Sequence, residues 1–160
     1  MRLAKPVSIL CLMITGATMA HAQNADIIKQ RREEMRVIAK AGDAPFKMTR
    51  DQAPFDLAAV QTVLKAIEEN APRFKAMFPD DSKTGPTDAT AKVWESPAEF
   101  NAALDNYVAT VRAASAAVKD EASLKVEYPK IVEGCGACHG RRGGFAPGLS
   151  ESFKRMEEPL

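Results

Sequence analysis

Residues 57–78, LAAVQTVLKAIEENAPRFKAMF, give the clearest indication of the fold class. Apolar side chains recur in this stretch at alternating intervals of three and four residues: Leu57, Val60, Leu64, Ile67, Ala71, Phe74 and Phe78. This spacing places them on one face of an α-helix, along which the helices of a bundle pack. Pro72 lies inside the stretch and has no N–H to bond to the carbonyl of Glu68, so we expect a kink there.

A helix is also predicted upstream, over residues 26–41. Its apolar residues share one face: Ile28, Met35, Ile38 and Ala39. Gly42 is expected to end this helix, because glycine readily adopts the left-handed conformation that closes helices. A loop bounded by Pro45 and Pro54 is expected to lead to the helix at 57–78.

Two helices are predicted downstream of a linker at 79–92, which is rich in Asp, Thr, Gly and Pro. Ser96-Pro97-Ala98-Glu99 has the pattern of a capping box with proline at the first helical position. The helix after it has this apolar face: Phe100, Leu104, Tyr107, Val111, Ala114 and Val118. The apolar face of the last predicted helix consists of Leu124, Tyr128, Ile131, Cys135 and Cys138. Pro129 is expected to limit how far upstream it is regular. No stretch alternates with period two, so the predicted fold is all-α, an antiparallel four-helix bundle.

Composition and charge exclude some classes of function. The chain has 160 residues, enough for one domain. Lys plus Arg is 22 and Asp plus Glu is 21, so the chain lacks the basic surplus of a nucleic-acid-binding protein. Hydrophobic residues make up 46% and charged residues 27%, which is typical of a globular protein.

Residues 1–22 have the features of a cleaved signal peptide. Arg2 and Lys5 precede an apolar stretch, Val7–Met19, and Ala20-His21-Ala22 fits the small-x-small cleavage pattern. The apolar stretch is too short to span a bilayer, which disfavours the alternative of a permanent anchor. We therefore predict a domain of residues 23–160 that is exported to the periplasm, an oxidising compartment, without stable insertion in the membrane.

The motif Cys135-Gly136-Ala137-Cys138-His139 carries the chemistry. C-x-x-C-H is the attachment pattern of c-type haem. Two thiols three residues apart lie on one side of a helical turn, where each can form a thioether with a haem vinyl group, and the histidine is held against the iron. Cys11 and His21 leave with the signal peptide, so the exported chain has no further cysteine or histidine. A closed Cys/His zinc site, which needs four ligands, cannot be completed.

Two other interpretations of the cysteine pair are open. A redox-active dithiol also uses C-x-x-C, but it is typical of a βαβ context and of a helix N-terminus. Cys135 and Cys138 instead fall late in the last predicted helix. A structural disulfide between them would close a very small loop and contribute little stability. Haem attachment is therefore favoured.

With these features the sequence resembles the class II c-type cytochromes, the family of cytochrome c′ and its low-spin relatives. In that family the C-x-x-C-H motif lies near the C-terminus of a four-helix bundle. Two other stretches are similar to the family: Phe78-Pro79-Asp80-Asp81-Ser82 leading to Val93-Trp94, and Arg31-x-x-x-Met35-Arg36. The resemblance implies one haem c, bound covalently through Cys135 and Cys138 near the C-terminal helix.

The resemblance also implies roles for Arg31 and Met35. His139 is the only histidine of the exported chain, so a second one from the same chain cannot be the sixth ligand. In low-spin members a methionine of the first helix binds the iron, and Met35 matches its position. In cytochrome c′ that face carries a non-ligating residue. Met48 is a second candidate ligand, and core packing is the alternative role for Met35. Arg31 matches an arginine that lies near a haem propionate in the family. The alternative is that Arg31 belongs to a charged, solvent-exposed face of the helix.

The sequence thus predicts an exported electron carrier with His139 and Met35 as iron ligands. It would exchange single electrons with redox partner proteins, as a monomer or homodimer. The first alternative is a five-coordinate cytochrome c′ that binds nitric oxide or carbon monoxide, and the second is a haemless dithiol oxidoreductase. No acid–base pair or nucleophile is recognisable, so an enzyme is not predicted. Glycines at 140, 143 and 144 are expected to end the last helix soon after His139, and 145–160 to form a short C-terminal extension.

Overall fold

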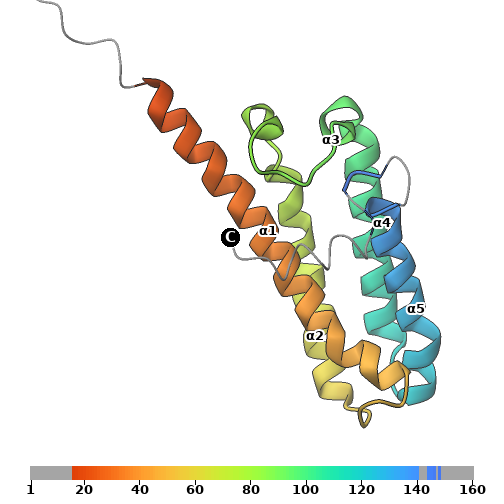
Figure 1. The fold of residues 1–160 in the computed structure, drawn as a ribbon. Coiled ribbons are helices and arrows are strands. Elements are labelled where there is room, and N and C mark those ends of the chain that lie inside the picture. Colours follow the sequence, from red (N-terminus) through yellow and green to blue (C-terminus); the bar gives the residue numbers. More distant parts are fainter. Residues whose placement is uncertain (1–15, 141–143, 147, 149–160) are drawn as a thin grey trace, which may run out of the picture.

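The computed structural model describes residues 16–140, 144–146 and 148, among which there are helices and no strand (Figure 1). Four helices form the bundle: α1 (Gly16–Thr49), α2 (Leu57–Asn70), α4 (Pro97–Ala117) and α5 (Glu121–Cys138). α1 and α4 each pack against both α2 and α5. Figure 1 shows the α1–α2 and α4–α5 turns at one end of the bundle and the α2–α4 connecting segment at the other. Consecutive bundle helices are therefore antiparallel, and the predicted fold is confirmed.

The main core lies where the predicted apolar faces meet. It includes Val60, Leu64 and Ile67 of α2, Leu104, Val111 and Ala114 of α4, and Leu124, Tyr128 and Ile131 of α5. Leu57 is the exception in the α2 pattern, because it is 37% exposed at the first position of the helix. The side chain of Asp56 caps this helix by accepting a hydrogen bond from the amide of Ala59 at 3.0 Å.

α1 is longer than the sequence predicts, because neither Gly42 nor Pro45 ends it. The Tyr128 hydroxyl of α5 donates to the Gly42 carbonyl at 2.6 Å, and Pro45 is fully buried inside the helix. Packing against the bundle thus outweighs the local tendency of glycine and proline to end a helix. Met48, expected in a loop, lies in the last turn of α1 and is buried in the main core.

At Pro72, where the sequence predicts a kink within the helix, the helix type changes. Regular α-helix ends at Asn70, and a 3₁₀-helix, η1 (Ala71–Ala76), continues with Pro72 in its first turn. The connecting segment that follows is predicted as an irregular linker, yet it contains two short elements, η2 (Asp80–Lys83) and α3 (Lys92–Glu95). Together with the start of α4 it lies at one end of the bundle (Figure 1).

The capping box predicted at Ser96 does not form. Ser96 precedes α4, but its side chain makes no capping hydrogen bond. The Glu99 carboxylate, which would have to reach back to the Ser96 amide, instead lies 3.4 Å from the Lys92 ammonium. The proline at the first helical position, Pro97, is confirmed.

A capping box is present instead at the start of α5. The Asp120 carboxylate accepts from the Ser123 amide at 2.8 Å, and the Ser123 hydroxyl accepts from the Asp120 amide at 3.0 Å. The helix then runs through Pro129, so the expectation that this proline limits it was wrong. Pro129 is exposed, and water can bond to the carbonyl that its missing N–H leaves free. α5 ends at Cys138 with His139 as its C-cap, as the glycines predict.

The predictions for the two ends of the chain fall largely outside the described residues. Of the predicted signal peptide, only the backbone of 16–22 is described, and it continues α1. Of the predicted extension, Phe145, Ala146 and Gly148 are described. Among the helices that the structure describes, none combines the length and apolar character needed to cross a membrane.

Candidate functional site

A cavity of about 580 Å³ lies inside the bundle near the end that carries the connecting segment. Every bundle helix contributes to its wall, and the lining is mostly apolar. Representative lining residues are Met35 and Ile38 of α1, Ile67 of α2, Leu104 and Tyr107 of α4, and Ile131 of α5. The volume is within the range of about 300–1,000 Å³ that is typical of sites for small molecules and cofactors.

The last turn of α5 places Cys135, Cys138 and His139 at this cavity. Both cysteines are free thiols and half-buried. The His139 amide donates to the Cys135 carbonyl at 3.0 Å, which keeps the histidine in helical register with the two thiols. All three residues of the predicted attachment motif are thus brought to one apolar cavity of suitable size, so they fit a haem c.

The environment of the thiols disfavours a reactive dithiol. Burial raises the pKa of Cys135, and burial also raises the pKa of Cys138. Reactive dithiols instead need a lowered pKa, which the N-terminus of a helix provides. Here the thiols lie at the C-terminal end of α5, where the helix dipole disfavours a negative charge.

Tyr107 is the polar neighbour of Cys135. The Cys135 Sγ lies 3.9 Å from the Tyr107 hydroxyl oxygen. The Tyr107 ring also occupies the space beside Gly134, where an added Cβ would lie only 2.8 Å from a ring carbon. Burial raises the pKa of Tyr107, so its hydroxyl stays protonated beside the sulfur. Periodicity placed Tyr107 on an apolar helix face, and only the register of α4 against α5 reveals this contact.

Arg31 also lines the cavity, but its guanidinium is committed to the connecting segment. It is 5% exposed. Nη1 donates to the Met77 carbonyl and the Ser82 hydroxyl, both at 3.0 Å, and Nη2 donates to the Ser82 carbonyl at 3.2 Å and to the Thr87 hydroxyl. Burial lowers the pKa of Arg31, against the opposing effect of Asp88. The predicted role beside a propionate stays a prediction, whereas these hydrogen bonds show that Arg31 fixes the connecting segment to α1.

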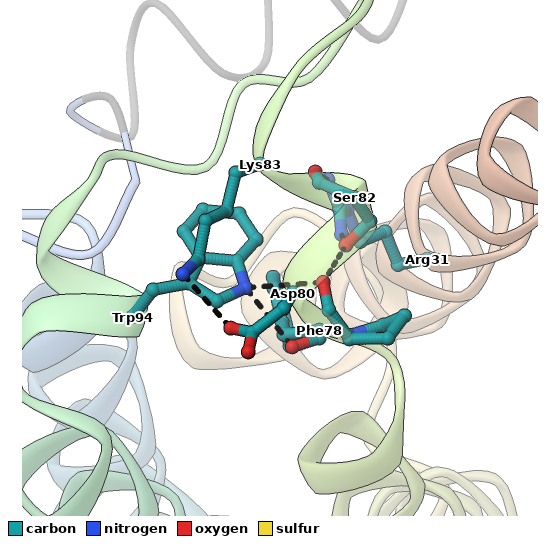
Figure 2. Close-up of polar contacts among 7 residues, drawn as sticks. Arg31, Phe78, Asp80, Ser82, Lys83 and Trp94 are labelled. Atoms are coloured by element: carbon teal, nitrogen blue, oxygen red, sulfur yellow. Dashed lines mark hydrogen bonds and ion pairs between the residues drawn. The ribbon is translucent and has the colours of Figure 1, made fainter. Parts of the chain in front are cut away.

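Aromatic side chains complete this part of the site, as Figure 2 shows around Arg31. The Arg31 guanidinium lies 4.7 Å from the centre of the Phe78 ring. Trp94 packs edge-on against Phe78, and its indole N–H donates to the Phe78 carbonyl at 3.0 Å. Phe100 continues the edge-to-face packing from Phe78 to Phe145, which is buried although the sequence assigns it to an extension.

The structure separates the two candidate methionine ligands. Met35 is half-buried and lines the cavity that His139 also lines. Met48 is 6% exposed and packs in the main core, outside the cavity lining. Of these two, Met35 is therefore the methionine that the fold brings to the same cavity as the haem-attachment motif.

Comparisons with known proteins agree with this site. The model of a family described as Cytochrome C' matches residues 26–141. The cytochrome c′ of Rhodopseudomonas palustris (strain ATCC BAA-98 / CGA009) is 37% identical over 129 residues, which are 80% of this chain and 88% of that protein. The cytochrome c-556 of the same strain is 31% identical over 97 residues, 58% of this chain and 65% of that protein.

Solved structures support the same assignment. Cytochrome c′ from Rhodopseudomonas palustris superposes with a TM-score of 0.69 at 37% identity, covering 71% of this chain and 92% of that chain. Cytochrome c prime from Shewanella frigidimarina has a TM-score of 0.69 at 23% identity, covering 78% and 96%, and shows the shared fold. Because the family match spans the four bundle helices and the attachment motif at their cavity, the chain belongs to the cytochrome c′ family, the class II cytochromes with covalently bound haem c.

Proposed function

We propose that the protein is an exported cytochrome with a single haem c, which binds nitric oxide or carbon monoxide at an open sixth position. Cys135 and Cys138 would hold the haem, and His139 would be the protein ligand of its iron. When bound, haem supplies the one-electron Fe(III)/Fe(II) couple and an axial position for a diatomic gas. The residues of this chain attach and orient the group and surround it with apolar side chains.

The observation that carries this proposal is the wall that α1 presents to the cavity, where apolar side chains lie beside the charged residues Arg32, Arg36 and Asp43. Met35, Ile38 and Ala39 of α1 line the cavity, and Phe74 lines it from η1. The polarity of the surroundings helps to decide what binds at haem iron, and apolar side chains favour a small uncharged ligand. The comparisons add weight, since the identity to a cytochrome c′ is 37% over most of both chains and the identity to a cytochrome c-556 is 31% over fewer residues.

An electron carrier with Met35 as the sixth ligand is the second candidate. It is favoured by one observation, that the Met35 side chain lines the same cavity as His139. A thioether suits haem iron and raises its reduction potential. Single electrons would then pass to and from redox partner proteins, and in neither proposal does the chain act as an enzyme.

Periplasmic location is part of the proposal. It is supported by the signal-peptide features of residues 1–22 and by a family match that begins only at residue 26. Light scattering, which gives the molar mass in solution, distinguishes a monomer from a homodimer.

Absorption spectra of the ferric and ferrous protein test the two candidates. An open sixth position predicts high-spin ferric haem, ready binding of carbon monoxide by the ferrous form, and the same spin state in Met35→Leu, which keeps the side-chain volume. A low-spin spectrum with a near-infrared sulfur–iron band that Met35→Leu abolishes would overturn the proposal in favour of the electron carrier.

A further inference from the structure

One hydrogen bond joins α1 to α5 in the wall of the cavity, away from the attachment motif. The Tyr128 hydroxyl of α5 donates to the Gly42 carbonyl of α1 at 2.6 Å. A Cβ added at Gly42 would lie 3.0 Å from that hydroxyl oxygen, closer than side chains normally approach. A side chain at Gly42 would therefore require the Tyr128 hydroxyl or the helix that carries it to move by a few tenths of an ångström.

The position of the bond relates it to the haem site. Gly42 follows Met35 by seven positions, and Cys135 follows Tyr128 by seven. Seven residues are about two helical turns, or about 10 Å, so each pair lies on one face of its helix. All four residues line the cavity, and α1 and α5 run in opposite directions. The bond therefore lies about two turns from Met35 along α1 and about two turns from Cys135 along α5.

α1 is locally weakened at the same place. Pro45 lies inside the helix and has no N–H, so it cannot bond to the carbonyl of Ala41. Helices bend most readily at such prolines. The next carbonyl, that of Gly42, is the one that Tyr128 holds. Burial raises the pKa of Tyr128, which keeps its hydroxyl a donor at neutral pH.

We infer that the Tyr128–Gly42 hydrogen bond is a spacer, which sets the separation of α1 from α5 and so the room available for a sixth ligand between Met35 and the His139-bound iron. Tyr128 and Gly42 are thus positioning residues that act through the α1 wall. The inference deepens the proposed function and rests on it, because the ligand concerned is the diatomic gas.

The test is a double-mutant cycle on the haem-loaded protein, with carbon monoxide as the probe. In Gly42→Ala the added methyl group crowds the Tyr128 hydroxyl, and the spacer predicts that α1 moves slightly away from α5 in response. We expect the affinity of the ferrous protein for carbon monoxide to rise about fivefold or more, the lower end of typical coupling between sites. Tyr128→Phe removes both the bond and the atom that the methyl group meets. In that background, Gly42→Ala is expected to change the affinity little.

This second background is the matched control, because the same alanine is introduced with and without the hydroxyl. An equal effect of Gly42→Ala in both backgrounds, or no effect in either, overturns the spacer. Circular dichroism establishes that each variant is folded. If Gly42→Ala does not fold, Tyr128→Phe alone decides, and an unchanged affinity for carbon monoxide overturns the inference.

Failure of the proposed function is distinguishable from failure of the spacer. A low-spin wild type that binds no carbon monoxide overturns the open sixth position. The spacer then still predicts that Gly42→Ala allows carbon monoxide to bind. It also predicts that the double variant, Gly42→Ala with Tyr128→Phe, binds carbon monoxide no more tightly than Tyr128→Phe alone. A wild type that binds carbon monoxide with the same affinity as all three variants overturns the spacer and leaves the proposed function standing.

Discussion

Arg31 shows how a charged side chain in a helical sequence can serve packing. Its neighbours Arg32 and Arg36 pair with acidic groups, Asp88 at 3.9 Å and Glu33 at 3.6 Å. Arg31 itself is buried and bonds to carbonyl and hydroxyl groups of a distant segment. Its planar, forked guanidinium suits this multiple contact in a way that a lysine ammonium does not.

Replacing Arg31 by Met is expected to lower the free energy of unfolding by roughly 2–4 kcal/mol. The change leaves the buried Ser82 hydroxyl and the Met77 carbonyl without their donor, and each such loss costs about 1–3 kcal/mol. Chemical denaturation gives the free energy, and near-ultraviolet circular dichroism of Trp94, the only tryptophan, reports the connecting segment.

Arg31→Lys separates this structural role from a purely electrostatic one. Lysine keeps the positive charge and loses the forked donors, so we expect it to be nearly as unstable as Arg31→Met. Stability equal to the wild type in Arg31→Lys would contradict the structural role and favour a charge interaction with a propionate.

Residues differ in how readily sequence reveals their role. Cys135, Cys138 and His139 form a local motif with one dominant chemical meaning, so the sequence predicts their common site. The contact of Tyr107 with Gly134, and that of Tyr128 with Gly42, depends on how two helices are aligned. No local pattern encodes that alignment, and a glycine in a helix suggests an end before it suggests a close approach.

Helices as elements were predictable from periodicity, and their ends were not. Apolar residues that share one helical face predicted all four bundle helices, because burial of one face dominates helix stability in a folded protein. The ends depend on competition between local preference and packing. At Pro72 the local preference prevails and the α-helix stops, whereas at Pro45 complete burial of the ring prevails and α1 continues to Thr49.

The two potential caps of α4 and α5 offer a direct comparison. Asp120→Ala removes the side-chain acceptor of a formed capping box, so we expect the midpoint of thermal unfolding to fall by about 2–4 °C. Ser96→Ala removes a hydroxyl that makes no capping bond, and the midpoint should stay unchanged. Differential scanning calorimetry of both variants at neutral pH measures the difference, and equal midpoints would show that the Asp120 cap contributes nothing.

The cap also has a defined pH dependence. The hydrogen bonds from Ser123 lower the pKa of Asp120 in the folded protein. A carboxyl group whose pKa is lowered by folding stabilises the fold above its unfolded pKa, and this contribution is lost as the pH falls through the folded value. The difference between wild type and Asp120→Ala should therefore disappear in strong acid.

For the molecule as a whole, the bundle has two apolar clusters that relate differently to the cavity. The main core is only partly in contact with the cavity: Ile67, Leu104 and Ile131 line it, whereas Val60, Leu64, Val111 and Leu124 do not. The smaller cluster consists of Val93, Phe100 and Phe145, and all three line it. The packing of the smaller cluster and of the adjoining part of the main core therefore depends on what fills the cavity, whereas the part of the main core around Val60, Leu64, Val111 and Leu124 is packed by side chains alone.

A haem-free protein is therefore expected to lose order at one end only. Cys135→Ser/Cys138→Ser removes the covalent attachment and leaves a largely apolar space of about 580 Å³ beneath the smaller cluster. Protein interiors do not tolerate large voids, so Val93, Phe100 and Phe145 should lose their fixed packing.

Hydrogen exchange should show fast exchange in the connecting segment and strong protection where α4 meets α5 at the other end. The near-ultraviolet signal of Trp94 should collapse while most far-ultraviolet helical signal is kept. If the variant instead showed uniform protection and were as thermally stable as the haem-loaded protein, this division would be contradicted. The four helices would then pack the cavity end without a cofactor.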